Sequence, residues 1–353
     1  MELSSASQRV VVTELAADPA DAIERCLRLE PMTRPDPATL GPRDVVIAVK
    51  SASVGWVDLL MTAAQYQHLP KPPYTPGLEY AGEVVWTGSS ELAVGDQVLV
   101  DGFLAGPRSL GAYQSYGGFA SYAVAPVEAV HRIPGSLSLD QACNLLGNYE
   151  TAYHCLVTRG RIAAGETVLI HGASGSTGLA AVQIAKLRGA TVIATGRSAA
   201  KLDVVRQHGA DHTIDTSAGF ATLRDEVKAL TGGRGVDVVY DGVGGAISVE
   251  SLRAMRFGGR FLIVGWAATP GAVNMLPTNL MMMKSLDVLG CPTVISTVKD
   301  PASRAPRLEQ ILAWAKSGAI APHVSHVFPL AEFKDAMRAK WRGDVIGGCV
   351  LHP

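Results

Sequence analysis

The 353-residue sequence carries no strong excess of charge of either sign. Its formal net charge is −1, and its basic residues form no stripe interleaved with aromatic side chains, so no nucleic-acid partner is expected. No apolar run approaches the roughly 18 residues that span a membrane, so no membrane partner is expected either. Residues 1–18 contain three acidic residues and lack a long apolar core, so a secretory signal peptide is not expected.

Cysteine is scarce, and the residues present give no sign of a disulfide framework. The five cysteines are scattered along the chain and odd in number: Cys26, Cys143, Cys155, Cys291 and Cys349. We therefore expect a cytoplasmic protein whose thiols are reduced.

Glycines, by contrast, recur in one turn between a predicted strand and a predicted helix. An apolar run at residues 166–170 leads into a glycine-spaced turn, which opens directly into a helical pattern at residues 179–187. A second β-like run follows at residues 190–195, so the predicted order is strand, helix, strand. Glycines let the backbone approach a phosphate closely, and the first amides of the helix point at that anion. The pattern predicts a dinucleotide pyrophosphate site, and a glycine-rich structural turn is the alternative.

Acidic residues are missing where a dinucleotide-binding unit usually has one. NAD-binding units place an Asp or Glu about 20 residues beyond the glycines, where it accepts a hydrogen bond from the ribose 2′-hydroxyl. Residues 179–201 contain no acidic residue, and the expected position carries Gly196, Arg197 and Ser198, with Lys201 one helical turn further on. These donors suit a 2′-phosphate, so the sequence favours NADP(H) over NAD(H). The alternative is that Arg197 and Lys201 are ordinary surface cations.

Alternation of strand-like and helix-like segments continues to residue 290, which predicts an α/β fold with a doubly wound parallel sheet. Such sheets bind ligands beyond the carboxyl ends of their strands. The turns after the predicted strands at residues 236–241 and 260–265 should therefore border the nicotinamide half. The predicted cofactor-binding residues are Asn148, Thr151, Ser174, Gly175, Ser176, Thr177, Gly196, Arg197, Ser198, Lys201, Gly242, Val243, Gly265 and Trp266.

The remainder of the chain has a different pattern. Residues 1–132 show short β-like runs punctuated by Pro and Gly, which is typical of a separate, mainly β domain. We expect residues 291–353 to complete that domain and residues 133–290 to form the cofactor-binding domain.

The order of these parts resembles the medium-chain dehydrogenase/reductase superfamily, on its zinc-independent NADPH:quinone oxidoreductase branch. The resemblance rests on residues 74–84 (YTPGLEYAGEV), 95–98 (GDQV), 174–178, 209–211 (GAD) and 236–245, and it covers nearly the whole chain. It implies a GroES-like β-rich catalytic domain, a Rossmann-type cofactor domain and an active site in the cleft between them. We also expect a homodimer.

The same superfamily contains zinc alcohol dehydrogenases, so their ligand positions bear on this chain. The residues at the corresponding positions are Gly55, Leu78 and Gly147 or Asn148. None of them ligates zinc in the usual way. His323 and His326 fall in a β-like segment where their spacing places them on opposite faces, so we interpret them as structural. No metal site is expected.

Without zinc, the expected substrate is a small-molecule hydride acceptor whose conjugation spreads the developing charge, such as a quinone. The alternative is an enone or enoyl reductase in which Tyr66 donates the proton, because Tyr66 matches the tyrosine that related enoyl reductases use. Tyr66 packing against the cleft is an equally simple reading. Gly55 and Leu60 depart from residues found in many quinone oxidoreductases, and a non-catalytic NADPH-binding protein is a third alternative.

Overall fold

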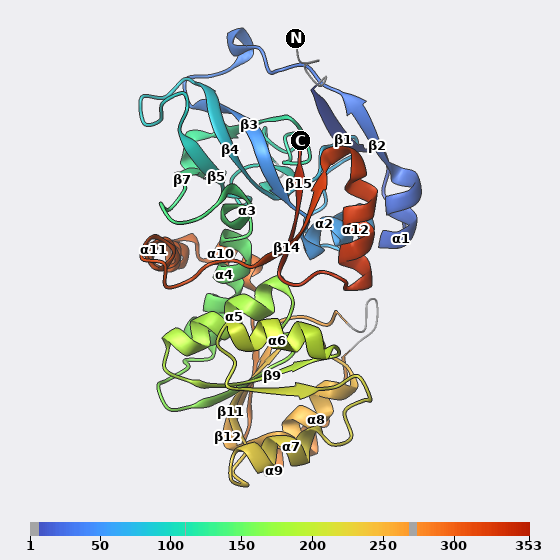
Figure 1. The fold of residues 1–353 in the computed structure, drawn as a ribbon, viewed down its shortest axis with the longest axis vertical. Helices are drawn as coiled ribbons and strands as arrows, with labels where there is room; N and C mark the ends of the chain where they lie inside the picture. Colours follow the sequence, from blue (N-terminus) through green and yellow to red (C-terminus); the bar gives the residue numbers. More distant parts are fainter. Residues whose placement is uncertain (1–6, 110, 268–273) are drawn as a thin grey trace. The chain divides into compact units, whose positions relative to one another are not determined.

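The computed structural model describes residues 7–109, 111–267 and 274–353. The chain divides into two compact units, one formed by Met1–Gly147 with Ala321–Pro353 and the other by Asn148–Ile320 (Figure 1). Within the described ranges, no helix has both the length and the apolar character needed to cross a membrane.

The first unit is built on a mainly antiparallel sheet that the C-terminal segment extends with the parallel pair of β14 and β15. Its strand order is β14-β15-β3-β4-β5-β7, with β6 also paired to β3, and β1 and β2 form a separate antiparallel pair. The strands are β1 Gln8–Val12, β2 Leu27–Pro31, β3 Asp44–Ser53, β4 Glu79–Thr87, β5 Gln97–Val100, β6 Tyr122–Pro126, β7 Val130–Arg132, β14 Val324–Pro329 and β15 Gly348–His352. The helices of this unit are α1 Pro19–Asp21, α2 Trp56–Thr62, α3 Leu139–Ala142 and α12 Phe333–Arg342. The predicted mainly β domain is therefore present.

The second unit contains a parallel sheet of strand order β10-β9-β8-β11-β12-β13. Every neighbouring pair is parallel, as the predicted doubly wound sheet requires. The strands are β8 Thr167–Ile170, β9 Thr191–Gly196, β10 His212–Asp215, β11 Val236–Asp241, β12 Met255–Ile263 and β13 Asp287–Gly290. The helices are α4 Leu146–Tyr153, which begins in the first unit, α5 Ser176–Leu187, α6 Ala199–Gln207, α7 Leu223–Leu230, α8 Ala246–Ala254, α9 Thr278–Met283, α10 Thr293–Lys299 and α11 Arg304–Lys316. The α/β fold class is confirmed.

The two units divide at positions that differ from the expected ones. Residues 133–147 belong to the first unit, since the Ser53 hydroxyl on β3 donates to the amide oxygen of Asn144 at 2.8 Å. Residues 291–320 belong to the second unit. There, Arg304 and Arg307 of α11 donate to the buried carboxylate of Glu150 on α4, at 2.6–3.1 Å. Contacts between segments distant in sequence decide both boundaries. The local composition of the sequence therefore does not predict where the boundaries lie.

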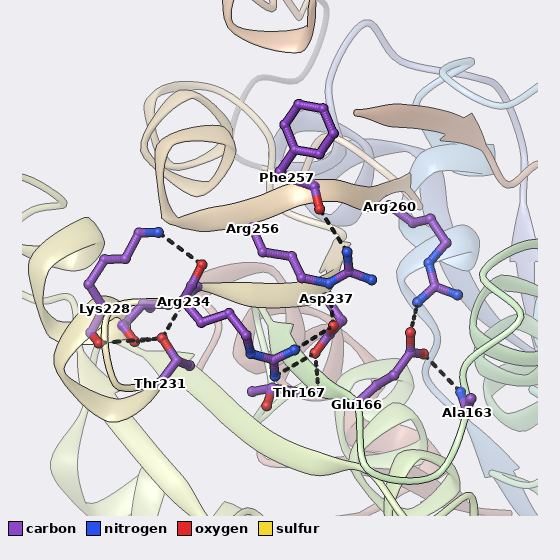
Figure 2. Close-up of polar contacts among 12 residues, drawn as sticks. Ala163, Glu166, Thr167, Lys228, Thr231, Arg234, Asp237, Arg256, Phe257 and Arg260 are labelled. Carbon is purple, nitrogen blue, oxygen red and sulfur yellow. Dashed lines mark hydrogen bonds and ion pairs between the residues drawn. The ribbon is translucent and has the colours of Figure 1, made fainter. Parts of the chain in front are cut away.

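Ion pairs secure the amino ends of the central strands (Figure 2). The buried carboxylate of Asp237 at the start of β11 accepts the Thr167 amide of β8 at 2.8 Å and pairs with Arg234 and Arg256. Glu166, just before β8, pairs with Arg260 of β12. This edge of the sheet is therefore held by charge, and the opposite edge carries the predicted cofactor residues.

Candidate active site

The glycine turn between β8 and α5 has the geometry that a phosphate-binding loop needs. Gly172 adopts a φ of +61°, which glycine accommodates without strain. A Cβ at Gly178 would lie 2.3 Å from the Gly172 carbonyl oxygen, so only glycine allows the helix to start this close to the turn. Helix α5 begins at Ser176, three residues before the start that the sequence pattern indicated.

The N-terminus of α5 has no side-chain cap. Gly175 occupies the N-cap position and no side chain caps the helix there. The predicted residues Ser174, Gly175, Ser176 and Thr177 thus surround the positive end of a 12-residue helix. The Thr177 hydroxyl donates to the side-chain oxygen of Asn148 at 3.1 Å, which brings α4 against this first turn. Thr151 lies three residues after Asn148, on the same face of α4.

The predicted 2′-phosphate residues follow β9 directly. Gly196 ends the strand, Ser198 is the N-cap of α6, and Lys201 lies in the first turn of that helix. Arg197 is exposed, and it forms neither an ion pair nor a hydrogen bond with any residue that the structure describes. Its guanidinium is therefore available to an anion at the N-terminus of α6.

The turns after β11 and β12 lie against each other. The Asp241 carboxylate, buried at the end of β11, accepts the amides of Val243 and Gly244 at 2.8 and 3.0 Å and the Ser248 hydroxyl of α8. The Gly265 amide donates to the Asp241 carbonyl at 3.2 Å, and a Cβ at Gly265 would lie 3.3 Å from the Gly242 carbonyl oxygen. The next residue, Trp266, has an exposed fraction of 57%.

These loops share one edge of the sheet. β9, β8, β11 and β12 are successive neighbours and run parallel, so their carboxyl ends face the same way. The predicted phosphate turn follows β8, where the strand order reverses between β9 and β11. This is the position at which doubly wound sheets bind dinucleotides.

Tyr66 lies in the first unit, after α2. Its side chain is half-buried, and its ring meets that of His68 edge-on with centroids 6.1 Å apart. No hydrogen bond to its hydroxyl occurs among the residues described. Trp56, at the start of α2, stacks on Trp341 of α12 with ring centroids 5.2 Å apart.

Two carboxylates organise the positions that correspond to zinc ligands. Asp58 accepts the amides of Gly55 at 2.9 Å and of Leu78 at 3.1 Å. Glu79 accepts the amide of Gly147, and a Cβ at Gly147 would lie 2.7 Å from a Glu79 carboxylate oxygen. Both carboxylates are thus occupied by backbone amides. Within the described ranges, no group of three or more His, Cys, Asp or Glu side chains is arranged to hold a metal ion.

Sequence reasoning did not assign these organising roles to Asp58, Glu79 and Asp241. Asp58 sits at the third position of α2 and Asp241 precedes a glycine-rich turn, and both are places where a carboxylate commonly accepts backbone amides. These positions in the sequence are the signal from which the roles of the two carboxylates could have been predicted. His323 precedes β14, and His326 on β14 shares a 2.7 Å hydrogen bond with Ser325.

Comparison with known proteins places the chain among dehydrogenases. The family described as the alcohol dehydrogenase GroES-like domain matches residues 41–135, and the family described as zinc-binding dehydrogenase matches residues 176–303. Quinone oxidoreductase-like protein 2 of Mus musculus is 33% identical over 318 residues, covering 88% of this chain and 86% of the mouse protein. Quinone oxidoreductase of Homo sapiens is 30% identical over 307 residues, covering 86% of this chain and 87% of its own.

A mycobacterial protein whose structure was solved in complex with NADPH has a similar fold. It superposes on 98% of this chain and 100% of its own with a TM-score of 0.80, at 26% sequence identity.

The Asp58 carboxylate makes stability depend on pH. Complete burial raises its pKa from 3.8 to about 6, although three backbone amides oppose the shift. A raised pKa means that the folded state binds the proton more tightly than the unfolded chain does. The resulting stabilisation is present in full below pH 4 and is lost as the pH rises through 6. We expect the free energy of unfolding to fall between pH 5 and 7.5 by about 1.4 kcal/mol more than in Asp58→Asn, because about one pH unit of the titration lies in that range.

Chemical denaturation at a series of pH values measures this difference. Asp225→Asn, at an exposed aspartate, is the matched control and should retain the pH slope of the unmutated protein. An Asp58→Asn slope equal to that of the unmutated protein would contradict the assignment.

Proposed function

The chain belongs to the medium-chain dehydrogenase/reductase superfamily, on its quinone oxidoreductase branch, and from that we propose an NADPH-dependent oxidoreductase that reduces a quinone or another conjugated acceptor without zinc. The observation that carries the proposal is the clustering of the glycine turn, the Arg197 loop and the Gly242–Gly265 contact at one edge of the sheet.

The residues present fit NADP(H). The uncapped start of α5 offers amides to the pyrophosphate, and Arg197, Ser198 and Lys201 surround the place where a 2′-phosphate would follow β9. An NADPH-bound structural relative at 26% identity supports the same assignment. When bound, the nicotinamide supplies the hydride. The protein orients it with the turns after β11 and β12, which Asp241 holds in shape.

Zinc independence is supported by the residues at the positions that correspond to zinc ligands. Gly55, Leu78 and Gly147 have no side-chain donor atoms for zinc, and the adjacent carboxylates bind backbone amides. At the alternative third position, the side-chain oxygen of Asn148 accepts the Thr177 hydroxyl. A conjugated acceptor takes hydride without a Lewis acid because its developing charge spreads to a remote oxygen. This favours quinones and activated alkenes over simple aldehydes as substrates.

Two alternatives follow from other features. Tyr66 has a hydroxyl without a hydrogen-bond partner among the described residues, which favours an enone or enoyl reductase in which that phenol donates the proton. A non-catalytic NADPH-binding protein is the less favoured alternative, and retained cofactor binding without turnover of any acceptor would identify it.

A homodimer and a cytoplasmic location complete the proposal. β13 is an edge strand that pairs with β12, and nearby Ile295 and Val298 on α10 are exposed. An open strand edge beside apolar side chains is a surface to which a second copy can add. The five cysteines are all buried and unbridged, in keeping with a reducing compartment.

A substrate panel tests the proposed reaction. We expect NADPH oxidation with quinones, enones or enoyl thioesters, no comparable rate with simple aldehydes, and no change after treatment with a chelator. Activity confined to aldehydes, or stoichiometric zinc lost together with activity on chelation, would overturn the proposal.

Selectivity for the 2′-phosphate tests the role of Arg197. Removing a charge-assisted phosphate contact costs about 1.5–3 kcal/mol, so Arg197→Ala should weaken NADPH binding roughly ten- to hundredfold and leave NADH binding unchanged. Titration of both cofactors measures the two dissociation constants. Arg188→Ala, at an exposed arginine beyond the far end of α5, should change neither constant. Equal affinity of the unmutated protein for NADPH and NADH would contradict the assignment of Arg197 to the 2′-phosphate.

Tyr66→Phe separates the two proposed acceptors. The variant keeps the ring but removes the proton donor, so turnover of an activated alkene should fall by about 10²-fold or more while NADPH binding survives. Quinone reduction should respond far less, because quinone oxygens collect protons from solvent. Rates are compared for both substrate types under the same conditions. If the variant reduces both at unmutated rates, Tyr66 only packs and water supplies the proton.

A further inference from the structure

A buried histidine lies directly beneath the predicted cofactor loops. His171 follows the last residue of β8 and precedes Gly172, the first glycine of the phosphate turn. Its amide donates to the Tyr240 carbonyl of β11 at 3.0 Å, and its exposed fraction is 1%. The side chain therefore points into the unit and not toward a ligand.

Both ring nitrogens of His171 are hydrogen-bonded. Nδ1 lies 2.9 Å from the Thr195 hydroxyl on β9, and Nε2 lies 2.6 Å from the Ser251 hydroxyl on α8. The Ser251 hydroxyl also lies 2.7 Å from the Ile247 carbonyl, and when it donates its single proton there it accepts from Nε2–H. In a neutral ring, Nδ1 then accepts the Thr195 proton. Burial lowers the pKa of His171, while the nearby Asp241 carboxylate opposes that shift, and the net direction favours the neutral ring.

Each partner of His171 belongs to an element that carries a cofactor loop. Thr195 is the residue before Gly196 and Arg197, which begin the predicted 2′-phosphate loop. Ser251 lies on α8, and the same helix contributes Ser248 to the Asp241 carboxylate that shapes the turn after β11. One imidazole thus links the ends of β8 and β9 to the helix that follows β11.

We propose that His171 is a positioning residue that sets NADPH selectivity by holding the end of β9, through Thr195, in register with the phosphate turn. The inference rests on the proposed cofactor site. A 2′-phosphate is bound by side chains that begin two residues after Thr195, whereas NADH makes no charged contact there. Displacement of that loop therefore weakens NADPH binding selectively, because charge-assisted contacts depend steeply on geometry.

Two substitutions separate the two arms of the link. Thr195→Val keeps the side-chain shape but removes the hydroxyl, and NADPH affinity should fall about fivefold or more while NADH affinity changes less than twofold. Thr195→Ser restores a hydroxyl and should recover most of the NADPH affinity. Ser251→Ala cuts only the arm to α8, so any loss should affect the two cofactors by the same factor.

The matched control removes a threonine hydroxyl at the opposite edge of the sheet. The Thr231 hydroxyl donates to the Val227 carbonyl and accepts the Gly235 amide, both at 2.8 Å, before β11 begins. Thr231→Val should lower the melting temperature without changing the ratio of the NADPH and NADH dissociation constants.

Fluorescence titration of NADPH and NADH with each variant gives that ratio, and thermal unfolding of each variant gives its stability. If Thr195→Val loses stability but keeps the unmutated ratio, the histidine is only structural and the proposal is overturned. Equal affinity of the unmutated protein for the two cofactors overturns both the 2′-phosphate site and this inference.

A measurement on the unmutated protein needs no variant to fold. Nitrogen-15 chemical shifts of the His171 ring should report a neutral imidazole with the proton on Nε2, unchanged between pH 6 and 8. A ring that titrates between pH 6 and 8 would show that the imidazole is open to solvent and not held between Thr195 and Ser251, and this would overturn the proposed link.

Discussion

Parallel pairing of β8 with both β9 and β11 is the constraint on which the candidate site depends. It brings the carboxyl ends of these strands to one edge, so residues far apart in sequence reach the same neighbourhood. The glycine turn, the Arg197 loop and the turn after Asp241 could not otherwise serve one extended ligand. At the opposite edge of the sheet, a different kind of interaction holds the strand ends together. There, Asp237 and Glu166 use ion pairs to hold the amino ends of β8, β11 and β12 (Figure 2).

Buried carboxylates that accept backbone amides shape the turns at both candidate centres. Asp241 fixes the turn after β11, and Asp58 fixes the loops around Gly55 and Leu78. Burial makes an ionised carboxylate costly unless several donors satisfy it, so such a residue defines one loop conformation and disfavours others. The raised pKa of Asp58 shows that three amides compensate its burial only in part.

The same carboxylates bear on the proposed zinc independence. At the three ligand positions the chain offers backbone amides in place of thiolate or imidazole, and Asp58 and Glu79 accept them. A Cβ at Gly147 would meet Glu79 at 2.7 Å, so restoring a ligand there requires more than one substitution. The proposed hydride acceptor, which disperses its own charge, would fit such a centre better than a simple carbonyl.

The sequence alone predicted the features that depend on neighbours in the chain. Glycine spacing indicated the phosphate turn, apolar periodicity indicated the doubly wound sheet, and the acid-free stretch before Leu202 indicated the 2′-phosphate preference. The tertiary structure decided what depends on distant contacts. Glu150 with Arg304 and Arg307 assigns residues 291–320 to the second unit, and the close approach of Gly178 to the Gly172 carbonyl leaves no room for a side chain in the first turn of α5. His171 is a single polar residue after an apolar strand, and no local sequence pattern predicts a role for it. Its function follows only from Thr195 and Ser251, which lie 24 and 80 residues away in the chain and adjacent in space.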